Sequence, residues 1–247
     1  MRAQKKNFNT LFITVLIMTW TISLCCKSQN KKEQAAVEDS PLEQVVPEGW
    51  ISLFDGKTLA GWEIVRYGGE GEPYVKNGSL VLPRAVNGLM TGVCWVGDSL
   101  PNSDYIIYYE AKRVEGYDIF AGLSFPCGDS YASLIIGGWG GIVNGLSCIN
   151  GYDASENETT QHFSVRDNEW LPIELYVTTE RIRAVLKNDV LFDVSTKGKN
   201  IHLRGGLLDT GFTLWTYLTT GEIKNLRIKK LKNQDEKTVL NKSPNSK

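Results

Sequence analysis

The chain has 247 residues, of which 42% are hydrophobic, and its formal net charge is −1 from 27 basic and 28 acidic side chains. This length supports one sizeable hydrophobic core and is common for a single all-β domain. The balanced charge argues against a nucleic-acid-binding or anionic-membrane-binding surface and favours neutral ligands such as sugars.

Residues 1–26 have the pattern of a bacterial targeting segment. Three basic residues lie within the first six positions, and a short apolar stretch, Leu11–Leu24, follows them. This stretch is shorter than the roughly 20 residues that cross a bilayer as a helix, and it ends in ISLCC, which resembles a lipoprotein box. We therefore expect a lipid anchor at Cys25 or Cys26 and a location in the bacterial cell envelope or periplasm. Plain secretion and an uncleaved anchor helix are the alternatives.

The rest of the chain divides into three parts. Residues 27–46 are polar and rich in charge, which is typical of a flexible tether. Residues 47–231 carry turn signals at short spacing and no long helical periodicity, and residues 232–247 read as a disordered tail. One folded domain is therefore expected between the tether and the tail.

Short strands joined by turns are predicted along this domain. Asn77-Gly78 lies between β-forming residues, which is the strongest short signal for a hairpin. Residues 173–195 read as three strands, and residues 211–218 and 223–231 supply two more. The chain is expected to form an all-β, two-sheet antiparallel sandwich of the jelly-roll type.

Residues 105–126 predict a hairpin of two neighbouring strands. Apolar and polar side chains alternate in both strands, so one face of each should lie in the core. With a three-residue loop at Glu115–Tyr117, Glu110 would pair with Gly122. This register would place five side chains together on the sheet face away from the core: Tyr108, Glu110, Lys112, Asp118 and Ser124.

The cysteine and histidine content argues against a zinc site. Beyond the targeting segment only Cys94, Cys127 and Cys148 remain, so at most one disulfide forms and at least one thiol stays free. No Cys-x-x-Cys motif is present, and histidine occurs only at His162 and His202.

The stretch LIIGGWGGIVNG, residues 134–145, places Trp139 between two pairs of glycines. Glycine weakens a strand and offers no side chain to the core. Glycines that bend the strand and keep bulk away would leave the Trp139 ring exposed to stack on a sugar. The alternative is a β-bulge with Trp139 buried.

The segment EGWISLFDGKTLAGWE, residues 48–63, resembles the opening motif of the bacterial 3-keto-disaccharide hydrolase family. The likeness continues through VKNGSLVL, SLIIGGWGGIVNGLS, DASENET and IKNLRIKKL, so it covers about residues 48–231. The resemblance implies a concanavalin-like jelly roll, an envelope location and action on oxidised sugars. The E-x-D-x-x-E motif of laminarinase-type glycoside hydrolases, which share this fold, is missing here.

A glycoside oxidised at C3 permits cleavage by elimination, because the ketone acidifies the C2 hydrogen. The protein must then supply a base near C2, stabilisation for the enolate oxygen and an acid for the leaving group. Glu110 and Asp118 are the candidates for base and acid, and Lys112 for the enolate charge. A solvated ion cluster is the alternative. The candidates for substrate binding are Tyr108, Ser124, Trp139 and Arg227.

A second group of polar residues, Asp153, Glu156 and Glu158, lies in the segment GYDASENETTQHF. It reads as a polar connecting loop, with a second acid/base pair or a structural calcium site as alternatives. No other metal and no organic cofactor are identified.

The sequence thus predicts an envelope-anchored hydrolase of 3-keto glycosides, with a non-catalytic, lectin-like carbohydrate-binding module as the alternative. The expected partner is a small carbohydrate. Contact with a membrane is expected through the lipid anchor only.

Overall fold

A computed structural model describes residues 46–204 and 211–232, all of which fall within one compact unit. The predicted targeting segment, the tether up to residue 45 and the tail from residue 233 lie outside the described residues. The described residues form fifteen strands and one single-turn helix, α1 (Gly138–Gly141). No helix among them is long and apolar enough to cross a membrane.

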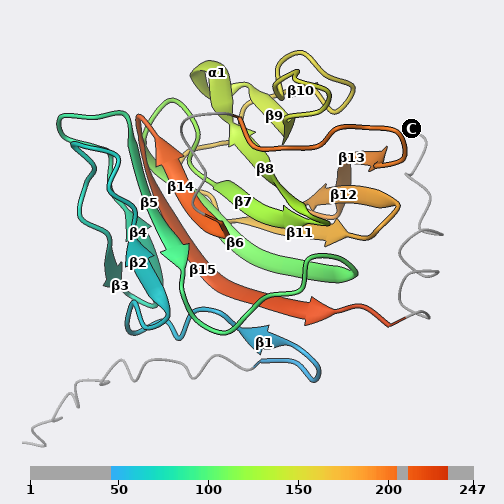
Figure 1. Cartoon of the computed structure of the whole chain (residues 1–247). Helices are drawn as coiled ribbons and strands as arrows, with labels where there is room; N and C mark the ends of the chain where they lie inside the picture. The colour runs from blue at the N-terminus through green and yellow to red at the C-terminus, as the bar shows by residue number, and fades with distance from the viewer. Residues whose placement is uncertain (1–45, 205–210, 233–247) are drawn as a thin grey trace, which may run out of the picture. The chain divides into compact units, whose positions relative to one another are not determined.

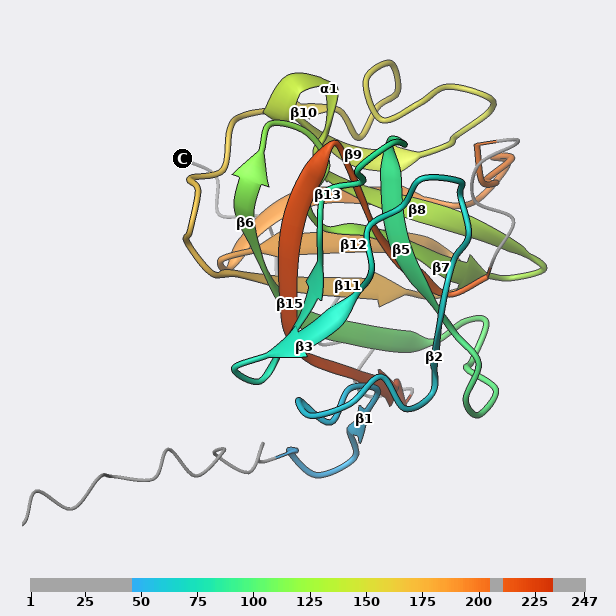
Figure 2. The same cartoon turned by 90° about the vertical axis from the view of Figure 1, so that its left-hand side faces the viewer.

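Sheet A contains eight antiparallel strands, which bury one face because their side chains alternate. In β6 (Tyr105–Gly116), Ile107, Tyr109 and Ala111 are fully buried, whereas the residues between them are partly exposed. The long neighbours β6 and β15 lie side by side (Figure 1, Figure 2). The sheet order is β13 (Asp189–Ser195), β12 (Arg181–Leu186), β11 (Leu171–Val177), β6, β15 (Thr219–Lys230), β4 (Ser79–Leu82) and β3 (Tyr74–Lys76), and β1 (Ile51–Ser52) also pairs with β15.

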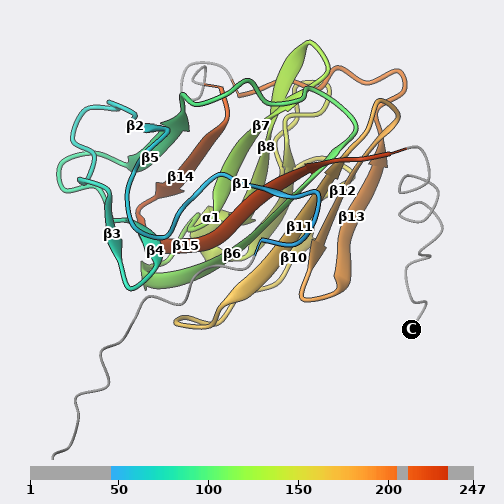
Figure 3. The ribbon, with the colours of Figure 1, turned by 90° about the horizontal axis from the view of Figure 1, so that it is seen from below.

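Sheet B contains the other seven antiparallel strands and packs against sheet A. Its inner side chains, such as Leu123, Leu134 and Leu214, share one hydrophobic cluster with Ile107 and Ile173 of sheet A. Figure 3 shows the two layers from below. The sheet order is β10 (Gln161–His162), β9 (Val143–Ser147), β8 (Ser130–Gly137), β7 (Gly122–Cys127), β14 (Thr213–Tyr217), β5 (Met90–Trp95) and β2 (Trp62–Ile64).

The predicted all-β, two-sheet antiparallel sandwich is confirmed. The Asn77-Gly78 turn joins β3 to β4, and both residues have the positive φ angles, 50° and 77°, that this hairpin turn requires. The three strands predicted within residues 173–195 correspond to β11, β12 and β13.

The predicted hairpin of residues 105–126 is wrong, because its two strands lie in different sheets. Glu110 pairs with Pro172 and Lys224 in sheet A, whereas Gly122 pairs with Trp215 in sheet B. Residues 117–121 carry the chain from one sheet to the other.

Two buried tyrosines show that β6 and β7 face each other across the core. The Tyr105 hydroxyl donates a hydrogen bond to the Pro126 carbonyl, and the Tyr109 hydroxyl donates to the Ala121 carbonyl at 3.4 Å. Burial raises the pKa of the Tyr109 hydroxyl far above its ordinary value, so it stays protonated as a donor. The alternation of apolar and polar residues identified the buried side chains of β6 correctly. It does not distinguish two strands that pair within one sheet from two strands that face each other across the core, because the same side chains point inward in both arrangements.

Candidate functional site

A pocket of about 600 Å³ lies on the outer face of sheet B. We call it the sheet B pocket. Its polar lining consists of Asp118, Ser133, Ser147, Asp153 and Arg204. Its apolar and aromatic lining consists of Leu89, Met90, Ile119, Ile135, Trp139, Trp215 and Tyr217.

A row of serines forms part of the floor, because residues paired across neighbouring strands point to the same face. Ser147 of β9 pairs with Ser133 of β8, which pairs with Ser124 of β7. The hydroxyls of Ser124 and Ser133 are 3.1 Å apart and hydrogen-bonded. Ser124, predicted to bind substrate, is fully buried, and its hydroxyl accepts a hydrogen bond from the Trp215 indole N–H at 3.2 Å. Ser124 therefore holds Trp215 of the pocket lining in place and is not itself part of that lining.

Trp215 lies across the glycine of the neighbouring strand. A Cβ atom at Gly122 would be 2.5 Å from the Trp215 ring, so the ring can lie flat only because Gly122 has no side chain. With its N–H bonded to Ser124, the ring is fixed at two points and is only 3% exposed.

Asp118 lies in the connection between the two sheets and is held by backbone groups. Its Oδ1 accepts a hydrogen bond from the Ile119 N–H at 2.9 Å, and its Oδ2 accepts one from the Gly140 N–H at 3.0 Å. Its own N–H donates to the Thr219 hydroxyl at 2.9 Å. The carboxylate is thus oriented as an acceptor at the pocket lining.

The glycine-rich segment forms a tight turn between β8 and β9 instead of a bent strand. Trp139 and Gly140 have φ angles of 49° and 78°, in the left-handed region. At Gly141, with φ of 93°, a Cβ atom would be 2.9 Å from the Tyr117 carbonyl oxygen. The turn therefore packs closely on the inter-sheet connection and presents the Trp139 ring, 40% exposed, at the pocket.

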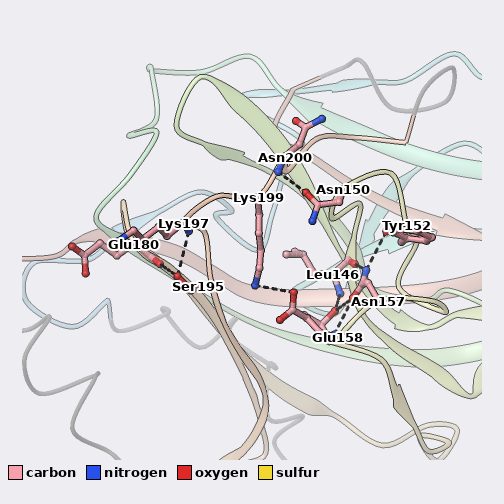
Figure 4. Close-up of polar contacts among 11 residues, drawn as sticks. Leu146, Asn150, Tyr152, Asn157, Glu158, Glu180, Ser195, Lys197, Lys199 and Asn200 are labelled. Carbon is pink, nitrogen blue, oxygen red and sulfur yellow. Dashed lines mark hydrogen bonds and ion pairs between the residues drawn. The ribbon is translucent and has the colours of Figure 1, made fainter.

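Hydrogen bonds from the Asn157 side chain hold the loop that carries Asp153 of the pocket lining. The Asn157 side-chain amide donates hydrogen bonds to the carbonyls of Leu146, Tyr152 and Asp153 at 2.7, 3.1 and 2.8 Å. Its Oδ1 accepts from the Thr159 N–H and hydroxyl at 2.9 and 2.6 Å. Figure 4 shows Asn157 between Leu146 and Tyr152. The DASENET segment is thus a loop that one asparagine closes.

A second segment, residues 196–204, is tied to this loop. The Asn150 N–H donates to the Asn200 carbonyl at 2.7 Å, and the Asn200 N–H donates to Asn150 Oδ1 at 2.8 Å. Lys199 forms an ion pair with Glu158 at 2.7 Å, visible in Figure 4. These contacts hold in place the segment that ends at Arg204 of the pocket lining.

Asp153 and Arg204, both part of the pocket lining, form an ion pair. An Arg204 guanidinium nitrogen lies 3.2 Å from Asp153 Oδ2. Asp153 Oδ1 accepts from the Cys148 thiol at 3.2 Å and lies 3.5 Å from the Ser147 hydroxyl. Burial, and then the neighbouring Asp153 carboxylate, raise the pKa of the Cys148 thiol to about 12, so it remains a protonated donor at neutral pH.

The predicted convergence of Glu110 with Asp118 is wrong. Glu110 and Lys112 lie on the outer face of sheet A, on the opposite side of the sandwich from the sheet B pocket. Glu110 accepts from the Asn225 amide at 2.7 Å and lies 3.4 Å from the Lys224 ammonium, and Lys112 pairs with Glu222 at 2.7 Å. Glu110 and Asp118 are separated because residues 117–121 carry the chain from sheet A to sheet B.

Tyr108 and Arg227, predicted to bind substrate, belong to the same outer face of sheet A. The Arg227 guanidinium lies 4.2 Å from the centre of the Tyr108 ring and 5.0 Å from that of the Trp50 ring. The Tyr108 hydroxyl donates to Glu110 at 3.1 Å, and burial followed by Glu110 raises its pKa to about 12. These residues make a stacked, charge-paired surface away from the pocket.

Of the predicted site residues, the structure brings Asp118 and Trp139 to the sheet B pocket, and Ser124 holds Trp215 of its lining. Sequence reasoning missed Arg204, Trp215 and Tyr217 as pocket residues. Trp215 and Tyr217 alternate with the buried Leu214, which placed them on the outer face of their strand. No local signal marked Arg204.

A second pocket, of about 550 Å³, has Phe163, Leu186 and Leu191 among its lining and includes none of the predicted site residues. Across residues 46–204 and 211–232, no group of three or more His, Cys, Asp or Glu side chains could hold a metal ion. Asp153 and Glu158 each contact a cationic side chain instead. A structural calcium ion bound through other oxygens stays a prediction.

Solved structures with the same fold come from carbohydrate-related proteins. A presumed glycosyl hydrolase from Parabacteroides distasonis has a TM-score of 0.51 at 15% identity, over 76% of this chain and 99% of that chain. The Crh5 transglycosylase has a TM-score of 0.51 at 10% identity, over 78% of this chain and 91% of that chain. At such identities the likeness shows the fold alone, which is a jelly roll. A comparison with curated proteins gives no match.

The sequence profile of the 3-keto-alpha-glucoside-1,2-lyase-like domain matches residues 49–229. The fold and this match together define a carbohydrate-active jelly-roll domain. The chain therefore belongs to the 3-keto-alpha-glucoside-1,2-lyase-like family, in agreement with the resemblance noted from its motifs.

Proposed function

We propose that this protein cleaves the glycosidic bond of 3-keto glycosides in the sheet B pocket. The C3 ketone lets a base remove the C2 proton, and the resulting enolate expels the C1 substituent as an alcohol. Addition of water to the C1–C2 double bond then completes hydrolysis. The family name, which describes 1,2-lyase chemistry on a 3-keto glucoside, supports this route.

Asp118 is the proposed base. Its two oxygens are oriented by the N–H groups of Ile119 and Gly140, and each oxygen retains a second lone pair for a substrate proton. Asp118 takes this role in place of Glu110, which lies on the outer face of sheet A.

Arg204 is the proposed partner of the enolate oxygen. A guanidinium has five N–H donors, so Arg204 can contact both Asp153 and a developing negative charge. Asp153, fixed by Cys148 and Ser147, would then position Arg204 rather than react itself.

Three other lining residues suit a sugar. The exposed Trp139 ring offers a face for the C–H groups of a pyranose, and Ser133 and Ser147 offer hydroxyl groups at the floor. Tyr217 is the proposed proton donor to the leaving oxygen. The single observation that carries the proposal is that a carboxylate, an arginine and an exposed indole line one pocket.

The test is turnover of 3-keto-trehalose in D₂O. We expect release of glucose together with deuterium at C2 of the keto sugar, and a loss of about hundredfold in kcat for Arg204→Gln. Binding without turnover would overturn the enzyme proposal and favour the lectin-like module. Turnover without deuterium at C2 would overturn the elimination route.

The proposed location is the bacterial cell envelope, through a lipid on Cys25 or Cys26. Both residues lie outside the described residues, and the support is the sequence pattern. Mass spectrometry of the N-terminal peptide from the native membrane fraction tests it, since an unmodified chain without a lipid would contradict the anchor.

A further inference from the structure

We propose that the β5–β14 side of the sheet B pocket is a leaving-group subsite that takes an apolar, aromatic aglycone in preference to a second sugar. This inference rests on the proposed function, because it assigns the substrate class of the same site.

The strand order divides the pocket into two sides. The strands follow the order β9-β8-β7-β14-β5 (Figure 1). Ser147 of β9 and Ser133 of β8 therefore lie on one side of the pocket, and Tyr217 of β14 and Met90 of β5 lie on the other. Asp153 and its partner Arg204 belong to the serine side, since Asp153 lies 3.5 Å from the Ser147 hydroxyl. The groups that suit a sugar are therefore gathered at one end.

Asp118 lies between the two sides. Asp118 precedes β7, the central strand of the pocket. Between Asp118 and β7, the Phe120 N–H donates to the Ile136 carbonyl of β8 and so keeps this segment beside β8. On the other side, the Tyr217 N–H donates to the Ile119 carbonyl at 2.8 Å. A keto sugar on the serine side would thus present its C1–C2 bond near Asp118 and direct its leaving group toward Tyr217.

The wall beyond Tyr217 is apolar and held in place. Leu89 is 52% exposed although it lines the pocket, and its carbonyl accepts the Leu218 N–H at 2.8 Å. Two residues of the same loop, Val86 and Asn87, donate their N–H groups to the Gly69 carbonyl at 3.1 and 3.2 Å. An exposed leucine fixed by backbone hydrogen bonds is a preformed contact surface.

The chemistry of this wall favours an aromatic aglycone over a second sugar. Of Leu89, Met90 and Tyr217, only Tyr217 carries a polar side-chain atom that can hydrogen-bond strongly, and the proposed reaction uses it. A second sugar would direct several hydroxyls at Leu89 and Met90 without partners. An aromatic ring would instead remove its own apolar area and that of the exposed Leu89 side chain from water.

The test compares the 3-keto derivatives of 2-phenylethyl glucoside and of methyl glucoside, which both release a simple alkyl alcohol, with that of trehalose, which releases glucose through its anomeric hydroxyl. We expect kcat/KM to be about tenfold higher for the phenylethyl compound than for the methyl compound, and higher than for trehalose. Leu89→Asn should lower the phenylethyl-to-methyl ratio by about fivefold. Val96→Asn is the matched control, because Val96 is also 52% exposed and is not part of the pocket lining.

Equal rates for phenylethyl and methyl substrates, or an equal effect of Leu89→Asn on both, would overturn the subsite. If no substrate is cleaved, the proposed function fails. Calorimetry then measures the binding of the 3-keto phenylethyl and methyl glucosides to the wild type and to Leu89→Asn. The subsite requires that the wild type bind the phenylethyl compound more tightly than the methyl compound and that Leu89→Asn remove this difference.

Discussion

The Asp118 carboxylate accepts a hydrogen bond from the Gly140 N–H at 3.0 Å, which joins the inter-sheet connection to the turn that carries Trp139. Gly140 donates this bond from a left-handed conformation, with φ of 78°. The glycine-rich segment therefore does more than expose an aromatic ring. It fixes the carboxylate and the ring relative to each other at one pocket.

Replacing Asp118 and Glu110 separately tests which side of the sandwich is active. Asp118→Asn should lower kcat on 3-keto-trehalose by a factor of about 10² to 10⁴, since it removes the proposed base. Glu110→Gln should leave kcat within about threefold of wild type, because Glu110 lies on the outer face of sheet A. Initial rates measure both. A severe loss in Glu110→Gln with unchanged stability would place the active site on sheet A.

Trp139→Ala should raise KM by about tenfold and change kcat little, because the ring contributes binding in both the ground state and the transition state. The free energy of unfolding should change by less than about 1 kcal/mol, since the side chain is 40% exposed. Steady-state kinetics and urea denaturation give these values. Tyr74→Ala on β3, 47% exposed, is the control. An unchanged KM in Trp139→Ala would exclude stacking.

Gly122→Ala should destabilise the domain by about 1–3 kcal/mol, because the new methyl group would meet the Trp215 ring at 2.5 Å. Gly140→Ala offers a comparison, since its Cβ would meet nothing within 4 Å and only the positive φ opposes it, at about 1 kcal/mol. Urea denaturation measures both. Equal stabilities for Gly122→Ala and wild type would mean that the indole can move off the strand.

The Cys148 thiol should make stability fall at high pH. Its pKa is raised to about 12 in the folded protein from an ordinary value of 9.0, so the folded state binds more protons than the unfolded state between these values. This contribution is fully present below pH 9 and is lost as the pH rises toward 12. Unfolding in urea at pH 8 and pH 10.5 should show a smaller fall for Cys148→Ser, which does not titrate there. Identical pH dependence in both proteins would contradict the raised pKa.

Local patterns in the sequence were sufficient for several features of this protein. Alternation identified the buried side chains of β6, Asn77-Gly78 marked the β3–β4 turn, and the motif in residues 48–63 indicated the family. These features depend on residues that are neighbours in the chain, so short-range rules describe them.

The site depended on contacts that such rules do not contain. Period-two alternation states which side chains of β6 and β7 face the core, and it is the same whether the strands pair or face each other. Only the fold placed the two strands in different sheets, separating Glu110 from Asp118, and brought Arg204 to Asp153. The sequence by itself therefore determined the faces of the strands and the family, while tertiary packing decided which polar groups share a pocket, because that depends on how the chain passes between the sheets.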